Sequence, residues 1–203
     1  MDLNASSPRL LLLRHGQIKA NKTGHWHGST DSGLTFRGRR QAKRTGRYLK
    51  HLKLAGVYAS PLVRCRHTAE LATAHTDLEV KPLPDLQEMH IGEWEGLSFK
   101  ALQEEHGLFD ALKDPDYQPP GGESLNEVAD RVCKAMTSVS SRHGADETVL
   151  IVSHGVAMGT ALARFLDQRV EQWRDYHFDN CSLTEILVSP EPQVLSFNQT
   201  FHL

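Results

Sequence analysis

The sequence is poor in the features that mark secreted and membrane proteins. Only three of its 203 residues are cysteines, Cys65, Cys133 and Cys181, and they lie far apart, so neither a disulfide framework nor a CxxC zinc site is expected. No apolar run exceeds five residues, whereas a membrane helix needs about 20. The segment from Met1 to Arg9 also lacks the basic and apolar regions of a secretory signal. We therefore expect a reduced, cytoplasmic protein with no membrane partner.

The composition is that of an ordinary folded protein. Hydrophobic residues make up 39% of the chain and charged residues 24%. The length of 203 residues is close to the commonest domain size of ~100–200 residues. No linker or low-complexity segment interrupts the chain, so we predict a single domain over residues 1–203.

The net charge of -2 conceals an uneven distribution of charge. Between Ser32 and Ala69 there are ten Lys or Arg residues and no acid, whereas Asp85 to Asp116 holds nine acids and only two lysines. The basic segment is either a solvated helix face or a positive rim that steers small anionic substrates. Nucleic acid is not expected as a partner, because the whole chain is slightly acidic and its aromatic residues do not alternate with basic ones.

Two short apolar runs each lead into a histidine and a glycine. The runs Leu10–Leu13 and Val149–Val152 are followed by the tripeptides Arg14-His15-Gly16 and Ser153-His154-Gly155. Apolar runs of this length predict fully buried strands of a parallel sheet. Because ligands of open α/β sheets bind at the carboxyl ends of the strands, we expect His15, His154 and Arg14 to converge in one crevice that suits a phosphate group.

Capping residues and hydrophobic spacing predict further helices and strands. Thr35, Ser98 and Ser124 are expected to cap helices, and Ser60 is expected to cap one that has Pro61 at its first position. The predicted helices cover about residues 35–52, 61–72, 98–106, 124–142 and 155–166. The predicted strands beyond the two above cover residues 56–59, 183–188 and 194–197, the last two as a closing hairpin or an edge pair.

Four further residues have a structural as well as a functional interpretation. A surface salt bridge would explain Arg64, but its helix begins at the end of a strand, where free backbone N–H groups favour anions, so we place Arg64 in the site. His25 and His27 have a spacing that a metal could use, although no third or fourth ligand accompanies them. Asn21 is also a common type of turn residue.

Six motifs follow one another along nearly the whole chain. They are Arg14-His15-Gly16 with Asn21, Leu34-Thr35-x-x-Gly38-x-x-Gln41-Ala42, Ser60-Pro61-Leu62-x-Arg64-x-x-x-Thr68-Ala69, Glu88-x-x-x-Gly92-x-Trp94-Glu95-Gly96, Gly121-Gly122-Glu123-Ser124, and Ser153-His154-Gly155. In this order they resemble the histidine phosphatase superfamily, which contains cofactor-dependent phosphoglycerate mutases. The chain also resembles its smaller phosphatase members, such as α-ribazole phosphatase-like proteins.

The resemblance implies a fold and a set of roles. The fold would be an α/β three-layer sandwich, with a mostly parallel central sheet flanked by helices. His15 would be the nucleophile that forms a phosphohistidine, and Glu88 would donate the proton. Arg14, Arg64 and His154 would form the phosphate pocket, with Asn21 as a further contact. No metal or other cofactor would be needed. Another branch takes its acid from an Asp after the second histidine, where this chain has Gly155.

The chemistry calls for the same residue types. Phosphate-monoester hydrolysis needs accelerations of up to ~10²¹, of which one general acid supplies ~10²–10⁴, so charge stabilisation by arginine must do most of the work. His15 must be neutral to attack, and two nearby guanidinium groups favour that form. Its other ring nitrogen then needs an acceptor such as a backbone carbonyl. His154 would be more useful as a protonated donor to bound phosphate. Glu93 or Glu95 is the alternative to Glu88 as the acid.

The sequence therefore predicts a metal-independent phosphomonoesterase that releases inorganic phosphate from a small phosphorylated metabolite. Only 32 residues separate Glu88 from Gly121, which favours a short, open mouth and hydrolysis over phosphoryl return. A phosphoglycerate mutase and a non-catalytic phospho-ligand-binding module are the alternatives. At the pocket mouth the chain departs from the family pattern at Gln17, Ile18 and Ala20, so the substrate specificity of relatives does not carry over to it. A homodimer is compatible with the sequence.

Overall fold

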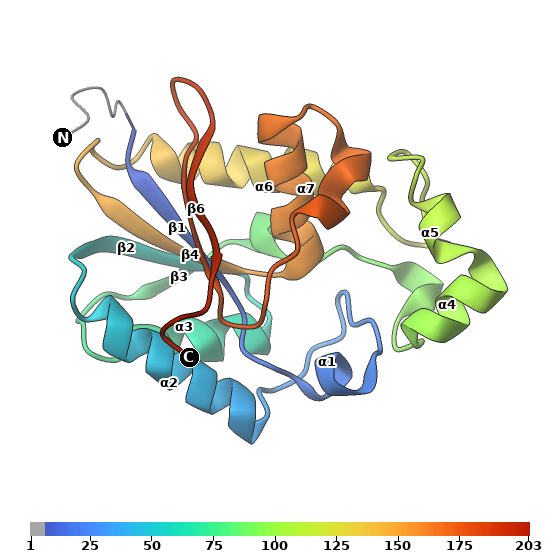
Figure 1. Ribbon diagram of the computed structural model, residues 1–203, viewed down its shortest axis with the longest axis horizontal. Helices are drawn as coiled ribbons and strands as arrows, with labels where there is room; N and C mark the ends of the chain where they lie inside the picture. Colours follow the sequence, from blue (N-terminus) through green and yellow to red (C-terminus); the bar gives the residue numbers. More distant parts are fainter. Residues whose placement is uncertain (1–6) are drawn as a thin grey trace.

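A mixed six-stranded sheet forms the centre of the computed structural model, which describes residues 7–203 (Figure 1). The strand order is β3-β2-β4-β1-β5-β6. The parallel strands are β1 (Arg9–Arg14), β2 (Leu54–Ala59), β3 (Val80–Pro82) and β4 (Thr148–Ser153). The hairpin of β5 (Leu183–Leu187) and β6 (Gln193–Gln199) joins antiparallel to β1. This confirms the predicted α/β fold and the predicted hairpin.

The two strands that carry the histidines lie side by side. In the parallel pair β1–β4, Leu12 is opposite Ile151 and Arg14 is opposite Ser153. The two strands therefore end at the same level, and the next residues, His15 and His154, emerge from the same edge of the sheet.

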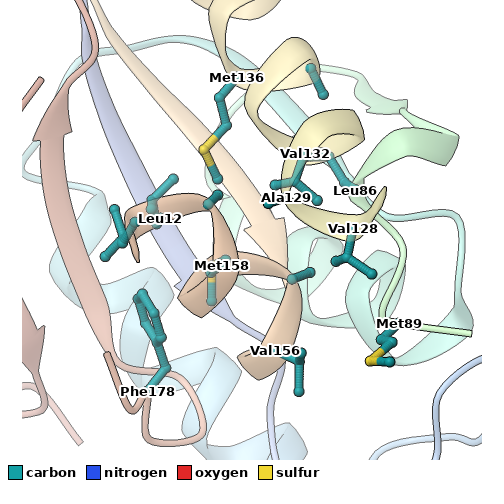
Figure 2. Packing of buried hydrophobic residues seen from close by; sticks show 14 of the residues in the cluster. Leu12, Leu86, Met89, Val128, Ala129, Val132, Met136, Val156, Met158 and Phe178 are labelled. Atoms are coloured by element: carbon teal, nitrogen blue, oxygen red, sulfur yellow. The ribbon is translucent and has the colours of Figure 1, made fainter. Parts of the chain in front are cut away.

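Helices cover both faces of the sheet, which explains the uninterrupted apolar runs. Leu10 and Leu12 of β1 pack into one core with α6 (Leu125–Ser140) and α7 (Gly155–Leu166). Figure 2 shows Leu12 in this core together with Met136 of α6 and Met158 of α7. Leu11 and Leu13 pack into the other core with α2 (Phe36–Leu49) and α3 (Val63–Thr73). Because both faces are buried, every residue of these strands can be apolar.

Three of the four predicted helix caps are confirmed. The hydroxyl of Thr35 accepts a hydrogen bond from Gly38 N at the start of α2, and Ser98 caps α4 (Phe99–His106). Ser124 caps α6 in a capping box with Glu127. The prediction for Ser60 was wrong. Helix α3 begins at Val63, and the Ser60 hydroxyl contacts His154 instead.

The structure also contains short elements that the sequence did not predict. They are β3, α1 (Lys19–Thr23), α5 (Leu108–Ala111) and the 3-10 helices η1 (Pro84–Leu86), η2 (Gly92–Trp94) and η3 (Val170–Asp175). Each has at most six residues, so none shows a hydrophobic period long enough to recognise. Several of them surround the cavity described below.

The structure bears on the predictions about cysteines and membranes. The three thiols are free, and Cys65 and Cys181 are buried, as expected for small core residues. None of the helices within residues 7–203 has both the length and the apolar character that crossing a bilayer demands. Residues 1–6, where the sequence shows no secretory signal, lie outside the described part of the chain.

Candidate active site

A cavity of about 630 Å³ opens where β1 and β4 end. Four of the predicted site residues line it, namely Arg14, His15, Asn21 and Glu88. The rest of its wall comes from the segment around α1, from α4 and α5, from the first turn of α7, and from residues 173–180. This is the edge of the sheet at which the sequence predicted a ligand site.

Hydrogen bonds fix the tautomer of His15. Its Nδ1 lies 2.8 Å from the carbonyl oxygen of Gly16. Since a carbonyl oxygen can only accept, Nδ1 carries the proton, and Nε2 has a free lone pair. The side chain is 3% exposed. Burial, and then the charges of Arg64 and Arg14, hold the pKa of His15 well below 6.5. His15 is therefore neutral near pH 7, with the predicted carbonyl partner.

The backbone around His15 is held by two side chains. Gly16 N donates to the hydroxyl of Thr68 on α3 at 3.0 Å. The Asn180 side-chain amide donates to His15 O at 3.0 Å and to Asn21 Oδ1 at 3.1 Å. Asn180 was missed by the sequence analysis, because it is 165 residues from His15 and no local pattern marks it. The only signal in the sequence is that Asn180 is a polar residue shortly before β5, the strand that pairs with β1.

Arg14 has an unused donor near the cavity. One terminal guanidinium nitrogen donates to the carbonyl of Phe178. Its Nε is buried and has no hydrogen-bond partner within residues 7–203. The guanidinium lies against Gly155, where an added Cβ would be 3.5 Å from Nε. A buried donor without an acceptor is costly, and a bound anion would satisfy it.

Arg64 and His154 lie behind the cavity wall and bind each other. Arg64 Nε donates to His154 Nδ1 at 3.1 Å, and its terminal nitrogens donate to the carbonyls of Gly28 at 2.7 Å and Thr30 at 2.8 Å. Because an arginine can only donate, His154 Nδ1 is the acceptor, and its proton is on Nε2, 2.8 Å from the hydroxyl of Ser60.

His154 is therefore neutral in this structure, which differs from the protonated donor expected for a bound state. Burial, and then the charge of Arg64, hold the pKa of His154 well below 6.5. The rings of His15 and His154 meet edge to face, with centroids 5.3 Å apart. The two histidines and Arg64 lie close together, next to Arg14, but the single crevice predicted for all four is lined only by Arg14 and His15.

The Glu88 carboxylate is bound to the start of helix α7. Its Oε1 accepts hydrogen bonds from Ala157 N at 2.9 Å and from Met89 N at 3.1 Å, and its Oε2 accepts one from Val156 N at 3.2 Å. The first turn of a helix has free N–H groups and partial positive charge, so it holds a carboxylate well. Glu88 is 7% exposed and lines the cavity beside His15.

The two alternative acids lie elsewhere. Glu93 is exposed and does not line the cavity. Glu95 accepts hydrogen bonds from Ser29 N and from the Thr30 hydroxyl, each at 2.6 Å. Glu95 thus holds the loop whose carbonyls bind Arg64. No pattern in the sequence predicts this role for Glu95.

The basic segment contributes Arg64 to the site, while α2 presents its cations elsewhere. Arg39, Arg40, Lys43, Arg44 and Arg47, with Phe36, line a separate groove of about 400 Å³, called here the α2 cationic groove. No residue of α2 takes part in a side-chain ion pair within residues 7–203. This is the solvated helix face foreseen from the sequence. Within residues 7–203, no group of three or more His, Cys, Asp or Glu side chains is placed so that it could hold a metal ion.

Comparison with known proteins places this site in context. A family model described as "Histidine phosphatase superfamily (branch 1)" matches residues 10–200. A probable phosphoglycerate mutase of Erwinia tasmaniensis is 31% identical over 93% of this chain and 88% of its own length. An adenosylcobalamin/alpha-ribazole phosphatase of Salmonella typhimurium is 34% identical over 78% of this chain and 79% of its own length.

Solved structures of phosphatases share the fold of this chain. A mycobacterial glucosyl-3-phosphoglycerate phosphatase superposes with a TM-score of 0.87 and 28% identity, covering 95% of this chain and 100% of that one. Some relatives are longer. Three mycobacterial proteins are 35% identical over 96% of this chain, which spans only 55% of their length.

Proposed function

We propose, from the premise that this chain belongs to the histidine phosphatase superfamily, that it hydrolyses small phosphate monoesters through a phosphohistidine on His15. The family and the phosphatase class predicted from the sequence are confirmed by the matches above. The observation that carries the proposal is the neutral His15, with its Nδ1 bound to the Gly16 carbonyl, in one cavity with Glu88.

In the first step the phosphoryl group moves to the enzyme. His15 Nε2 attacks phosphorus, and the bond from phosphorus to the ester oxygen breaks. The leaving alkoxide takes a proton from the Glu88 carboxyl. The Gly16 carbonyl stabilises the positive charge that the imidazole ring acquires, because it accepts the hydrogen bond from Nδ1. The products are the free alcohol and phosphohistidine.

In the second step water replaces His15 on phosphorus. The Glu88 carboxylate takes a proton from water, the oxygen of which attacks as the bond from Nε2 to phosphorus breaks. Inorganic phosphate leaves, and His15 returns to its neutral tautomer. The three N–H groups that hold Glu88 keep its carboxyl in place for both proton transfers.

Positive charge near the phosphoryl group supports both steps. Arg14 Nε has no acceptor of its own within residues 7–203, so it can donate to a bound phosphoryl oxygen, whereas Val156 N and Ala157 N at the start of α7 already donate to Glu88. Asn21 lines the cavity and is held by Asn180. Arg64 contributes its charge from behind His154, and direct contact of Arg64 or His154 with phosphate would need their present hydrogen bonds to rearrange.

The test is hydrolysis of p-nitrophenyl phosphate in excess EDTA. His15→Ala should lower kcat/KM by about 10³-fold or more, because it removes the nucleophile. His75→Ala is the matched control, since His75 is exposed and outside the cavity, and it should leave the rate unchanged. Quenched turnover of a radiolabelled ester should place the label on His15. A label on another side chain, or phosphate binding without any turnover, would contradict the proposal.

Phosphoglycerate mutase activity is the second candidate, because some relatives carry the name probable phosphoglycerate mutase. It requires that the phosphoryl group return from His15 to another hydroxyl of the glycerate. Interconversion of 2- and 3-phosphoglycerate that depends on the bisphosphate would favour this activity over hydrolysis.

A further inference from the structure

Exposed aromatic rings gather at the mouth of the cavity. Phe99 is 42% exposed and Phe109 is 37% exposed, and both line the cavity that contains His15 and Glu88. They are two of only six large hydrophobic side chains that are exposed within residues 7–203. Apolar surface left exposed beside a cavity is typical of a ligand-binding surface.

Neighbouring side chains hold both rings in place. Phe99 of α4 stacks on the buried Trp26, with ring centroids 5.6 Å apart and an angle of 22° between the planes. The Arg174 guanidinium of η3 lies 4.1 Å from the centre of the Phe109 ring of α5. Rings that are already oriented lose little freedom when a ligand stacks on them.

The cavity is also large for a phosphorylated three-carbon acid. Its volume of about 630 Å³ lies within the range of ~300–1,000 Å³ that is usual for drug-sized ligands. On the inner wall, Arg14 and His15 can hold the phosphoryl group, next to the proton donor Glu88. The aromatic rim formed by Phe99 and Phe109, with the buried Trp26 packed against Phe99, is then left for the alcohol half of the substrate.

We propose that the aromatic rim selects phosphate monoesters whose alcohol carries a planar aromatic ring. This inference rests on the proposed hydrolysis and names its substrate class. Phe99 and Phe109 are specificity-determining residues, and Trp26 and Arg174 are positioning residues for them. Recognition of a substrate carboxylate by Arg174 is the competing interpretation, but the Arg174 guanidinium already lies over Phe109.

The test compares substrates that share one kind of leaving oxygen. Ethyl, 2-cyclohexylethyl and 2-phenylethyl phosphate all release a primary alkoxide, so differences in kcat/KM report on the carbon group rather than on leaving-group ability. The phenyl ester should exceed the cyclohexyl ester by roughly 3- to 10-fold, as expected for stacking beyond simple burial. The cyclohexyl ester should exceed the ethyl ester. O-Phosphoserine, as an anionic substrate of small volume, completes the series.

Conservative variants locate the preference. Phe99→Leu and Phe109→Leu keep apolar volume and remove the ring, so each should reduce the phenyl-to-cyclohexyl ratio towards one. Phe36→Leu is the matched control, because Phe36 is 85% exposed and belongs to the α2 cationic groove. It should leave the ratio unchanged.

The outcomes separate this inference from the function on which it rests. Hydrolysis of every ester with no preference for the phenyl group, or a preference for O-phosphoserine, overturns the aromatic selectivity and leaves the phosphatase intact. If the preference for the phenyl ester persists in both leucine variants, neither Phe99 nor Phe109 selects the ring, and the proposal is overturned. Failure to hydrolyse any ester overturns the phosphatase and the selectivity together. The substrate series uses the unaltered chain, so it tests the selectivity for an aromatic ring even if a variant does not fold.

Discussion

At the scale of single residues, the site depends on side chains that are held in one orientation by their hydrogen bonds. Glu88 accepts three backbone N–H groups, and His15 has its Nδ1 bound to a carbonyl. Arg64 donates to His154 and to two loop carbonyls. Such groups need little reorganisation during a reaction, which is how a preorganised site lowers a barrier.

Glu88→Gln should slow esters of alkyl alcohols far more than p-nitrophenyl phosphate. An alkoxide needs a proton as it leaves, whereas p-nitrophenolate does not, so we expect a loss of about 10²–10⁴ in kcat/KM for the former. The parameter kcat/KM covers the steps up to release of the alcohol and so isolates the first proton transfer. Glu93→Gln, at an exposed glutamate, is the control. Equal losses for both kinds of ester would assign the acid to another residue.

The stability of the protein should fall as the pH drops below 6.5. His15 and His154 have pKa values well below 6.5 in the folded chain, so between 6.5 and those values the unfolded chain binds more protons. The free energy of unfolding then rises with pH, by up to roughly 1.4 kcal/mol per unit for each histidine. Urea midpoints measured from pH 8 to pH 5 test this.

The control for the pH dependence is a comparison of two variants. His15→Gln should flatten the dependence below pH 6.5, and His75→Ala, at an exposed histidine, should not alter it. A slope that is the same in both variants would assign the titration to other groups.

Residues next to predicted strands could be located from the sequence, and residues fixed by distant contacts could not. Arg14, His15 and His154 follow apolar runs directly, so strand pairing brought them together as expected. Asn180 and Ser60 act through contacts 165 and 94 residues away. No local pattern encodes such partners, and Ser60 looks like a helix cap because Pro61 follows it.

At the scale of elements, the turn after β1 packs directly on the first turn of α2. A Cβ added to Gly16 would lie 2.6 Å from Gly38 O, and one added to Gly38 would lie 2.2 Å from Gln17 O. The two backbones therefore touch because both residues lack side chains. The contact fixes the turn that carries His15.

Gly38→Ala should destabilise the protein by about 1–3 kcal/mol. Alanine in a helix is normally better than glycine by ~0.5–1 kcal/mol, but a 2.2 Å contact with a backbone carbonyl forces the two segments apart. Gly33→Ala is the matched control, because a Cβ there would meet nothing within 4 Å. Urea denaturation compares them. Equal midpoints for the two variants would mean that the turn after β1 and the first turn of α2 move apart with no loss of stability.

The sequence predicted long elements well and short ones badly. Helices α2, α4, α6 and α7 have caps or hydrophobic periods of their own, and their positions are confirmed within a few residues. Segments such as α1, α5 and η3 have no such signal, because tertiary contacts rather than local preference determine them. These same segments form much of the cavity mouth, so its aromatic lining was not foreseen.

At the scale of the whole molecule, the sheet is buried between two layers of helices. Successive leucines of β1 alternate between the two cores, so that Leu12 faces α6 and α7 and Leu13 faces α2 and α3. The three-layer architecture follows from the apolar runs of β1 and β4. The strand order does not, because it depends on how helices cross over the sheet.

Leu12→Ala and Leu13→Ala should each lower the free energy of unfolding by about 2–5 kcal/mol, because both leucines are fully buried. Leu195→Ala is the control, since Leu195 is 43% exposed and should cost no more than about 0.5 kcal/mol. A sheet covered on one face only would show a large loss for one of the two neighbours and a small loss for the other. Denaturation midpoints of the three variants distinguish these cases.

The α2 cationic groove should govern how the protein behaves on a chromatography column. By its net charge of -2 the chain would pass through a sulfonate or heparin resin at neutral pH. Adsorption, however, depends on the local field, and five cations on one helix can orient the molecule towards the resin. Retention followed by elution in moderate salt would give a purification step that needs no affinity tag.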